Sequence, residues 1–141
     1  MQKILAVLLV VITLASCATL PEDGSPSSAE KITGKWVGNY KCSQGITGVT
    51  LELLGSKDGF VEGTFQFYPT PSNPGAATGK FIVRGVYFSD GRLELGRGAW
   101  IEYPEGYISV SLRGKINPAT GQYSGVVPEC FNSTFLVTKQ A

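Results

Sequence analysis

Histidine is absent from this chain of 141 residues, and cysteine occurs only three times. The Ser/His and Cys/His pairs that many hydrolases use are therefore excluded, because a nucleophile needs a base beside it. No cysteine has a second cysteine or a histidine at the spacing typical of zinc ligands. We expect neither a metal site nor a cofactor.

An excess of charge is also missing, since 12 basic residues stand against 11 acidic ones and like charges never run beyond two. Nothing in this balance predicts a nucleic-acid partner or an electrostatic membrane patch. Glu102, Glu105 and Glu129 lie near aromatic residues, and glycosidases use pairs of carboxylates. A solvated turn or an outward strand position explains each of these glutamates, so we expect no enzymatic activity.

A hydrophobic run long enough to cross a bilayer as a helix, about 20 residues, does not occur in the sequence. The longest run, residues 4–14, follows Lys3 and is interrupted only by Thr13. A short apolar run behind a positive residue is typical of a signal peptide, which we place at residues 1–16.

The signal peptide leads into Leu14-Ala15-Ser16-Cys17. These residues resemble the lipobox of bacterial lipoproteins, in which the cysteine is lipidated and becomes the first residue of the mature chain. The resemblance implies that Cys17 carries acyl chains such as palmitate, which attach a protein permanently to a membrane. Ala18 stands where inner-membrane lipoproteins often have aspartate. The resemblance therefore favours the outer membrane, with the domain facing the periplasm.

The residues behind the lipobox combine prolines, serines and charges without a periodic apolar pattern. Such a composition offers too little apolar surface to offset the entropy of ordering. We therefore expect residues 17–31 to comprise the lipidated cysteine and a flexible tether, and residues 32–141 to form one globular domain.

Apolar residues at helical spacing are missing from the domain, whereas glycines, aromatic residues and turn signals recur at short intervals. This pattern predicts an all-β domain of eight or nine short strands, with residues 99–104 counted as a strand of their own. Alternation groups apolar side chains on one face of three expected strands: Trp36 and Tyr40; Val49, Leu51 and Leu53; Val61, Phe65 and Phe67. It also directs Ile108, Val110 and Leu112 inward. Residues 79–89 are apolar on both faces, through Phe81, Val83 and Tyr87 and through Ile82, Val86 and Phe88, which is typical of a strand covered on both sides.

Locally connected strands must remove their edges, and an antiparallel up-and-down barrel does so most directly. A two-sheet β-sandwich is the alternative. In a barrel, Cys42 near the end of the first strand faces Cys130 near the beginning of the last one. The two cysteines left after lipidation would then form a disulfide that closes a loop of roughly 90 residues.

The domain opens with Gly34-Lys35-Trp36. This stretch resembles the Gly-x-Trp start of lipocalins and the similar start of avidins, both of which are eight-stranded up-and-down barrels. The resemblance implies a calycin-like barrel with the tryptophan at its closed end. The later lipocalin motifs and the biotin contacts of avidins have no counterparts here, so no ligand is transferred from either family.

Two segments stand out as possible contact surfaces. Residues 67–79 form a loop with three prolines that is longer than a hairpin requires, which is more typical of a functional loop. Residues 97–107 gather tryptophan, tyrosine and arginine, the residue types that most often anchor protein interfaces. The partner-binding candidates in these segments are Tyr68, Asn73, Arg97, Trp100, Glu102, Tyr103, Glu105 and Tyr107.

These observations lead to the expectation of a membrane-anchored protein that works by binding a protein partner in the envelope. Small lipid-anchored β-domains with a disulfide resemble lysozyme-inhibitor lipoproteins in architecture, which implies an inhibitor or immunity factor against an envelope-attacking hydrolase. One alternative is a lipocalin-like carrier of a small apolar ligand. The other is a structural accessory of an envelope complex.

Overall fold

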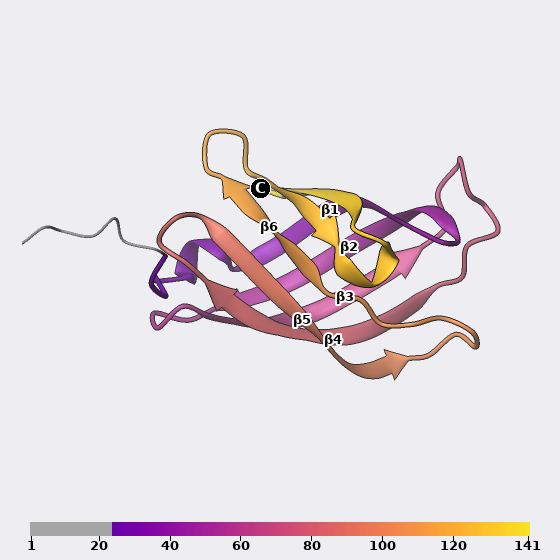
Figure 1. Ribbon diagram of the computed structural model, residues 1–141, viewed down its shortest axis with the longest axis horizontal. Coiled ribbons are helices and arrows are strands. Elements are labelled where there is room, and N and C mark those ends of the chain that lie inside the picture. Colours follow the sequence, from indigo (N-terminus) through magenta and orange to yellow (C-terminus); the bar gives the residue numbers. More distant parts are fainter. Residues whose placement is uncertain (1–23) are drawn as a thin grey trace, which may run out of the picture.

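The computed structural model describes residues 24–141, and residues 1–23, which contain the expected signal peptide and lipidation site, lie outside the described part. Eight strands follow one another along the chain (Figure 1). They are β1 (Gly34–Cys42), β2 (Gly45–Gly55), β3 (Phe60–Tyr68), β4 (Gly79–Tyr87), β5 (Arg92–Glu102), β6 (Leu112–Asn117), β7 (Gln122–Val127) and β8 (Ser133–Lys139).

Every strand pairs antiparallel with its neighbours in sequence, and β8 returns to pair with β1. The ladder between them runs from Trp36 opposite Lys139 to Tyr40 opposite Phe135. The closed up-and-down barrel is thereby confirmed, and the sandwich alternative is wrong. The expected separate strand at residues 99–104 is also wrong, because residues 99–102 are the last four residues of β5.

Side chains fill the interior of the barrel, which we call the core. The apolar side chains that alternation groups on one face of β1, β2 and β3 are all buried, and Trp36, Phe65, Phe67 and Phe81 are at most 2% exposed. The rings of Phe65 and Phe81 stack with their centroids 4.6 Å apart. A barrel of eight strands is just wide enough for side chains to fill. The aromatic rings therefore occupy the space in which a carrier would hold its ligand.

Tyr123 is a core residue that the sequence did not single out. Its side chain is completely buried, and its hydroxyl donates a hydrogen bond of 2.7 Å to the Leu93 carbonyl oxygen. The ring packs edge-on against Phe135. A buried phenol needs such a partner, because an unpaired hydroxyl in the core would lose its bonds to water.

One end of the barrel, the closed end, is covered by the short 3₁₀ helix η1 (Glu30–Ile32). The Trp36 indole N–H donates to the Ile32 carbonyl oxygen at 2.9 Å, which fixes the helix over the core. Within residues 24–141, no helix is long and apolar enough to cross a membrane.

The segment before η1 differs from the flexible tether that composition predicts. Ser27 N–H donates to the Tyr87 carbonyl oxygen at 3.0 Å, and Ala29 N–H donates to the Ser56 carbonyl oxygen at 2.8 Å. Ala29 is completely buried. Backbone groups at the strand ends supply partners that composition does not reveal, so the domain begins near residue 25 rather than at residue 32.

The disulfide between Cys42 and Cys130 is confirmed, with the two Cα atoms 5.0 Å apart. Cys42 ends β1, as expected. Cys130 lies in the 3₁₀ helix η2 (Pro128–Cys130) between β7 and β8, not in the last strand. The bridge therefore joins the β7–β8 connection to the end of the first strand, next to the seam that closes the barrel.

Several strands contain a glycine where the neighbouring backbone comes very close. A Cβ atom on Gly85 would lie only 1.6 Å from the Glu94 carbonyl oxygen of the adjacent strand. Because backbone cannot move aside as a flexible side chain can, the close approach of β4 and β5 at this point depends on the missing side chain.

We expect that replacing both Cys42 and Cys130 by serine lowers the free energy of unfolding by up to about 4–5 kcal/mol, since the bridge spans 88 residues of sequence. Urea unfolding of the variant and of the wild-type protein, each with and without reductant, measures the difference. An unchanged midpoint in the variant would contradict the structural role of the bridge.

We also expect Gly85→Ala to destabilise the protein by at least about 2 kcal/mol, because the added methyl group meets backbone. Gly75→Ala is the matched control, since a Cβ atom there would meet nothing within 4 Å. Its unfolding free energy should stay within about 0.5 kcal/mol of the wild type. Equal losses for the two variants in urea unfolding would refute the close-approach argument.

Candidate functional site

The long connections of the barrel gather at the end opposite η1, which we call the open end. Residues 69–78 connect β3 to β4, and residues 103–111 connect β5 to β6. In Figure 1 both connections project at the right, whereas the described chain enters at the left. The two segments that the sequence singled out therefore lie at one end of the molecule.

Aromatic rings join these two connections into one structure. The Tyr107 ring stacks on Phe67 with the centroids 5.4 Å apart, and Trp100 packs edge-on against both Phe67 and Tyr103. The backbone N–H of Ala77 donates to the Tyr107 hydroxyl at 3.0 Å. The loop from β3 to β4 is thus held against the loop from β5 to β6.

The path of residues 103–111 follows from an early end of the β5–β6 ladder. The two strands pair only between Arg92 and Leu95 of β5, although β5 continues to Glu102. Beyond this point the chains are bridged by side chains: Arg97 N–H donates to the Ser111 hydroxyl at 3.3 Å. The Ser111 N–H in turn donates to a carboxylate oxygen of Glu129. Because β5 and β6 are no longer paired here, residues 106–108 lie across part of the open end of the barrel.

The β1–β2 turn is the third component of the open end. Asn73 donates from its side-chain amide to the Gln44 carbonyl oxygen at 2.6 Å. Asn73 therefore has a local structural role, in which it ties the loop from β3 to β4 to the turn beside the disulfide.

The structure places the other predicted contact residues as follows. Arg97, Glu102, Tyr103 and Glu105 are exposed, while Trp100 and Tyr107 are half-buried in the aromatic cluster. Tyr68 is not part of this cluster, because its hydroxyl is bonded at 2.9 Å to the hydroxyl of Thr50 on the neighbouring strand. The candidates between residues 97 and 107 therefore lie at the open end, whereas Tyr68 lies outside the aromatic cluster.

Three exposed apolar residues of the open end were missed by the sequence analysis. Ile101 is 52% exposed, and Phe131, beside the disulfide, is 98% exposed. Ile108 was predicted to point inward but is 54% exposed. The alternation rule fails for Ile108 because residues 107–111 do not form a strand, so a period of two does not apply to them.

A cavity of about 310 Å³ opens between the β1–β2 turn and residues 106–108. Its walls include Tyr40, Gln44, Tyr107, Ile108 and Val110, next to Cys42 of the disulfide. We call it the mouth cavity. It lies over the core and is continuous with solvent, so it is a recess in the open end rather than an internal chamber.

Tyr40 is the most buried polar residue of the mouth cavity. Its hydroxyl accepts a hydrogen bond from the Gln44 amide at 3.0 Å. Burial raises the pKa of Tyr40 well above its usual value, an effect that the Gln44 bond partly offsets and that nearby Tyr107 reinforces. Burial also raises the pKa of Tyr123 in the core. Both phenols are consequently neutral at physiological pH.

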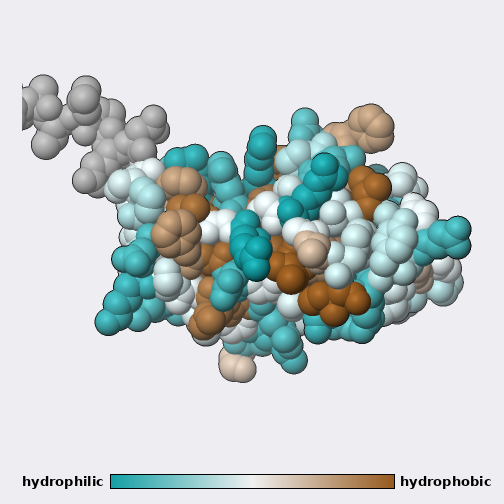
Figure 2. Space-filling model, turned by 90° about the horizontal axis from the view of Figure 1, so that it is seen from below, coloured by the Kyte–Doolittle hydropathy of each residue, from teal (hydrophilic) through white to brown (hydrophobic). Residues whose placement is uncertain are grey.

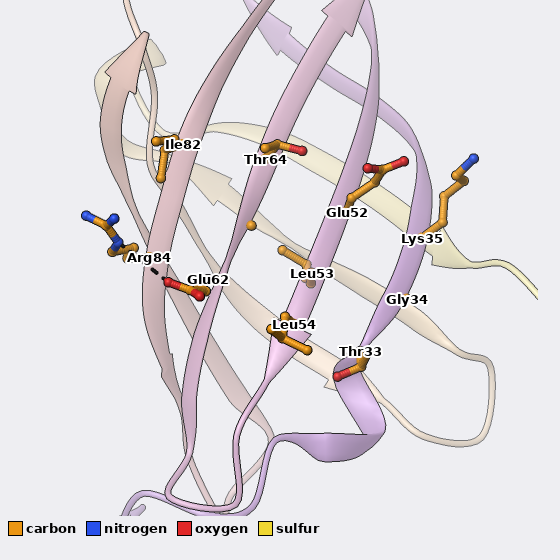
Figure 3. A pocket seen from close by; sticks show the side chains of 11 residues that line it. Thr33, Gly34, Lys35, Glu52, Leu53, Leu54, Glu62, Thr64, Ile82 and Arg84 are labelled. Carbon is orange, nitrogen blue, oxygen red and sulfur yellow. Dashed lines mark ion pairs between the residues drawn. The ribbon is translucent and has the colours of Figure 1, made fainter. Parts of the chain in front are cut away.

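A second hollow lies on the outer wall, across β1 to β4 (Figure 3). Leu53 and Leu54 contribute its apolar part, and Glu62 faces Arg84 at 3.9 Å along one side. Both ionic side chains are well exposed to solvent, so this pair adds little to stability.

Figure 2 shows hydrophobic residues on one broad face in several separate groups, divided by hydrophilic ones. Neither feature concentrates reactive groups.

Reactive clusters are also missing from the open end. Among residues 24–141, no three His, Cys, Asp or Glu side chains are arranged to hold a metal ion. Of the three glutamates considered in the sequence, Glu129 is engaged with the Ser111 backbone and is half-buried, while Glu102 and Glu105 are exposed. The open end consists of exposed loops above a cluster of packed aromatic rings.

The fold and the site together define the class of this protein as a small, disulfide-bonded, eight-stranded up-and-down barrel with an elaborated open end. Comparison with known proteins found no matching family model, no similar curated protein and no similar solved structure.

The two raised tyrosine pKa values predict a loss of stability at high pH. In the unfolded chain a tyrosine ionises near pH 10, whereas Tyr40 and Tyr123 resist ionisation when folded. The unfolded state therefore loses protons first, and the free energy of unfolding falls as the pH rises above about 10. Urea midpoints at pH 8 and pH 11 measure this decrease.

The matched pair of variants for this prediction is Tyr123→Phe and Tyr103→Phe. The first removes a buried phenol and should reduce the decrease between pH 8 and pH 11, while the second changes an exposed one and should leave it as it is. The same pH dependence in both variants would contradict the assignment.

Proposed function

We propose that this protein is a lipid-anchored, non-catalytic protein-binding module of the bacterial envelope, and that the open end is its binding surface. The lipobox-like residues 14–17 support the anchor, and Ala18 supports the outer membrane with the domain in the periplasm. The packed aromatic base beneath exposed loops supports the binding role.

The position of the anchor relative to the barrel favours this assignment. Only the six residues 18–23 separate Cys17 from the described domain, and six residues reach at most about 20 Å when fully extended. The described chain enters at the closed end. A domain anchored at Cys17 would hold its closed end near the bilayer and direct its open end away from it.

The observation that contributes most to the proposal is the exposure of large apolar side chains on the fixed loops of the open end. Ile101, Tyr103 and Ile108 are each more than half exposed. They are close in sequence to Trp100 and Tyr107, which are held by ring contacts and, for Tyr107, by a hydrogen bond from the Ala77 backbone. Loops that are already fixed lose little entropy when they bind, and exposed aromatic residues are frequent binding hot spots.

A partner-binding role fits the structure better than ligand carriage. The interior that a carrier needs is occupied by Phe65, Phe67 and Phe81, all completely buried. An inhibitor or immunity factor that blocks an envelope-attacking hydrolase requires only an exposed, preorganised surface of the kind found here. A structural accessory of an envelope complex would use the same surface with a resident partner.

We expect Tyr103→Ala and Ile108→Ala to weaken partner binding at least about tenfold, because both remove apolar contact area from the rim of the open end. The partner is first identified by cross-linking the full-length lipoprotein in its own cells, followed by mass spectrometry. Affinities are then measured with the purified partner, and the melting temperature of each variant is recorded.

Phe60→Ala is the matched control, since Phe60 is 65% exposed but lies at the start of β3, at the closed end. It should bind like the wild type. Wild-type affinity in both open-end variants, or an equal loss in the control, would refute the open end as the binding surface.

A further inference from the structure

The mouth cavity has hydrogen-bonding capacity that the protein itself leaves unused. The Tyr40 hydroxyl accepts from the Gln44 amide, and the Tyr107 hydroxyl accepts from the Ala77 backbone N–H. In the described part of the chain, neither hydroxyl has an acceptor for its own proton. A phenol that is only 4% exposed, as Tyr40 is, rarely keeps its donor unpaired.

The Gln44 side chain adds an acceptor beside these donors. Its amide nitrogen donates to the hydroxyls of Tyr40 and Thr47, at 3.0 and 3.1 Å. The Thr47 hydroxyl donates onward to the Gly45 carbonyl oxygen, which fixes the direction of the amide. The carbonyl oxygen of the Gln44 side chain has no donor among residues 24–141.

The remaining walls determine which molecules fit. Ile108 and Val110 are apolar, one face of the Tyr107 ring is already stacked on Phe67, and the half-cystine Cys42 is uncharged. None of the lining residues has a formal charge. A charged ligand would lose hydration without gaining a counter-charge, whereas a purely apolar ligand would leave two phenol donors and one amide acceptor unpaired.

We propose that the mouth cavity binds one residue of a neutral saccharide. A sugar ring combines hydroxyl or acetamido oxygens, which can accept from Tyr40 and Tyr107, with hydroxyl or amide hydrogens, which can donate to Gln44. Its C–H faces match Ile108, Val110 and the Tyr107 ring. A volume of about 310 Å³ is at the small end of ligand sites, which suits a single ring rather than an extended chain.

This site adjoins the apolar rim that the proposed function uses and shares Ile108 with it. The inference does not depend on that function, because it rests on the hydrogen-bonding groups of Tyr40, Gln44 and Tyr107. A saccharide could come from a free sugar or from a glycan polymer. The two sources share the same ring chemistry, and they differ in whether a second linked ring improves the affinity.

The test is a titration of the full-length, isotope-labelled protein in detergent micelles, followed by the backbone amide signals of Gln44 and Tyr107. The probes are methyl glycosides of glucose and of N-acetylglucosamine, the disaccharide N,N′-diacetylchitobiose, and octanoate as an apolar, charged comparison. We expect saturable shifts at the mouth cavity with at least one sugar, at dissociation constants in the millimolar range, and none with octanoate. Tighter binding of the disaccharide would indicate a polymer as the source.

Three variants show whether the unused groups are responsible. Tyr40→Phe and Tyr107→Phe each keep the ring and remove one donor, and each should weaken sugar binding about three- to tenfold. Tyr68→Phe is the matched control, because its hydroxyl is bonded to Thr50 on the outer wall, and it should not change the affinity. Melting temperatures show whether Tyr107→Phe disturbs the loop, and Gln44→Leu supplies an independent loss of the acceptor.

Three outcomes would each overturn the proposal. The first is the absence of a sugar-dependent shift at sugar concentrations up to about 50 mM, and the second is preferred binding of octanoate. The third is an equal sugar affinity in Tyr40→Phe, Gln44→Leu and the wild type. These outcomes leave the partner-binding experiment unaffected, since Tyr103→Ala and Ile108→Ala are measured with a protein partner.

Discussion

The closure of β1 against β8 is the constraint on which the rest of the structure depends. It pairs both edges of an eight-stranded sheet and so leaves no open row of backbone groups at the seam. Closure also fixes the barrel radius, and the buried rings of Trp36, Phe65 and Phe81 fill the resulting interior. The Cys42–Cys130 bridge reinforces this arrangement next to the seam by tying the β7–β8 connection to the end of β1.

The two ends of the closed barrel have different roles because their connections differ. At the closed end, η1 and the segment before it pack on the core through Trp36 and Ala29, and the remaining turns are short. At the open end, the early end of the β5–β6 ladder frees residues 103–111 to bend over the mouth. One irregularity in strand pairing therefore creates both the aromatic base of the proposed partner surface and the wall of the mouth cavity.

The open end combines two kinds of surface within a short distance. Its rim exposes Ile101, Tyr103 and Ile108, which suit a protein interface, while the recess behind it offers unpaired phenol and amide groups in uncharged walls. Buried side chains fill the interior, so both proposed recognition sites are at the open end and not in the centre of the barrel. The two proposals therefore concern neighbouring parts of one end of the barrel, and separate experiments test them.

The sequence by itself determined the all-β class, the inward alternation of the regular strands, the pairing of Cys42 with Cys130 and the two segments that meet at the open end. These follow from local periodicity and from chain topology, which depend only on near neighbours in sequence or on strand order. Tertiary structure alone decided that residues 25–31 pack on the barrel, that Ile108 points outward, and that Tyr40, Gln44 and Tyr107 surround one cavity. Each of these depends on where a ladder ends or on which distant backbone group is free to accept a hydrogen bond, and no local pattern in the sequence records that.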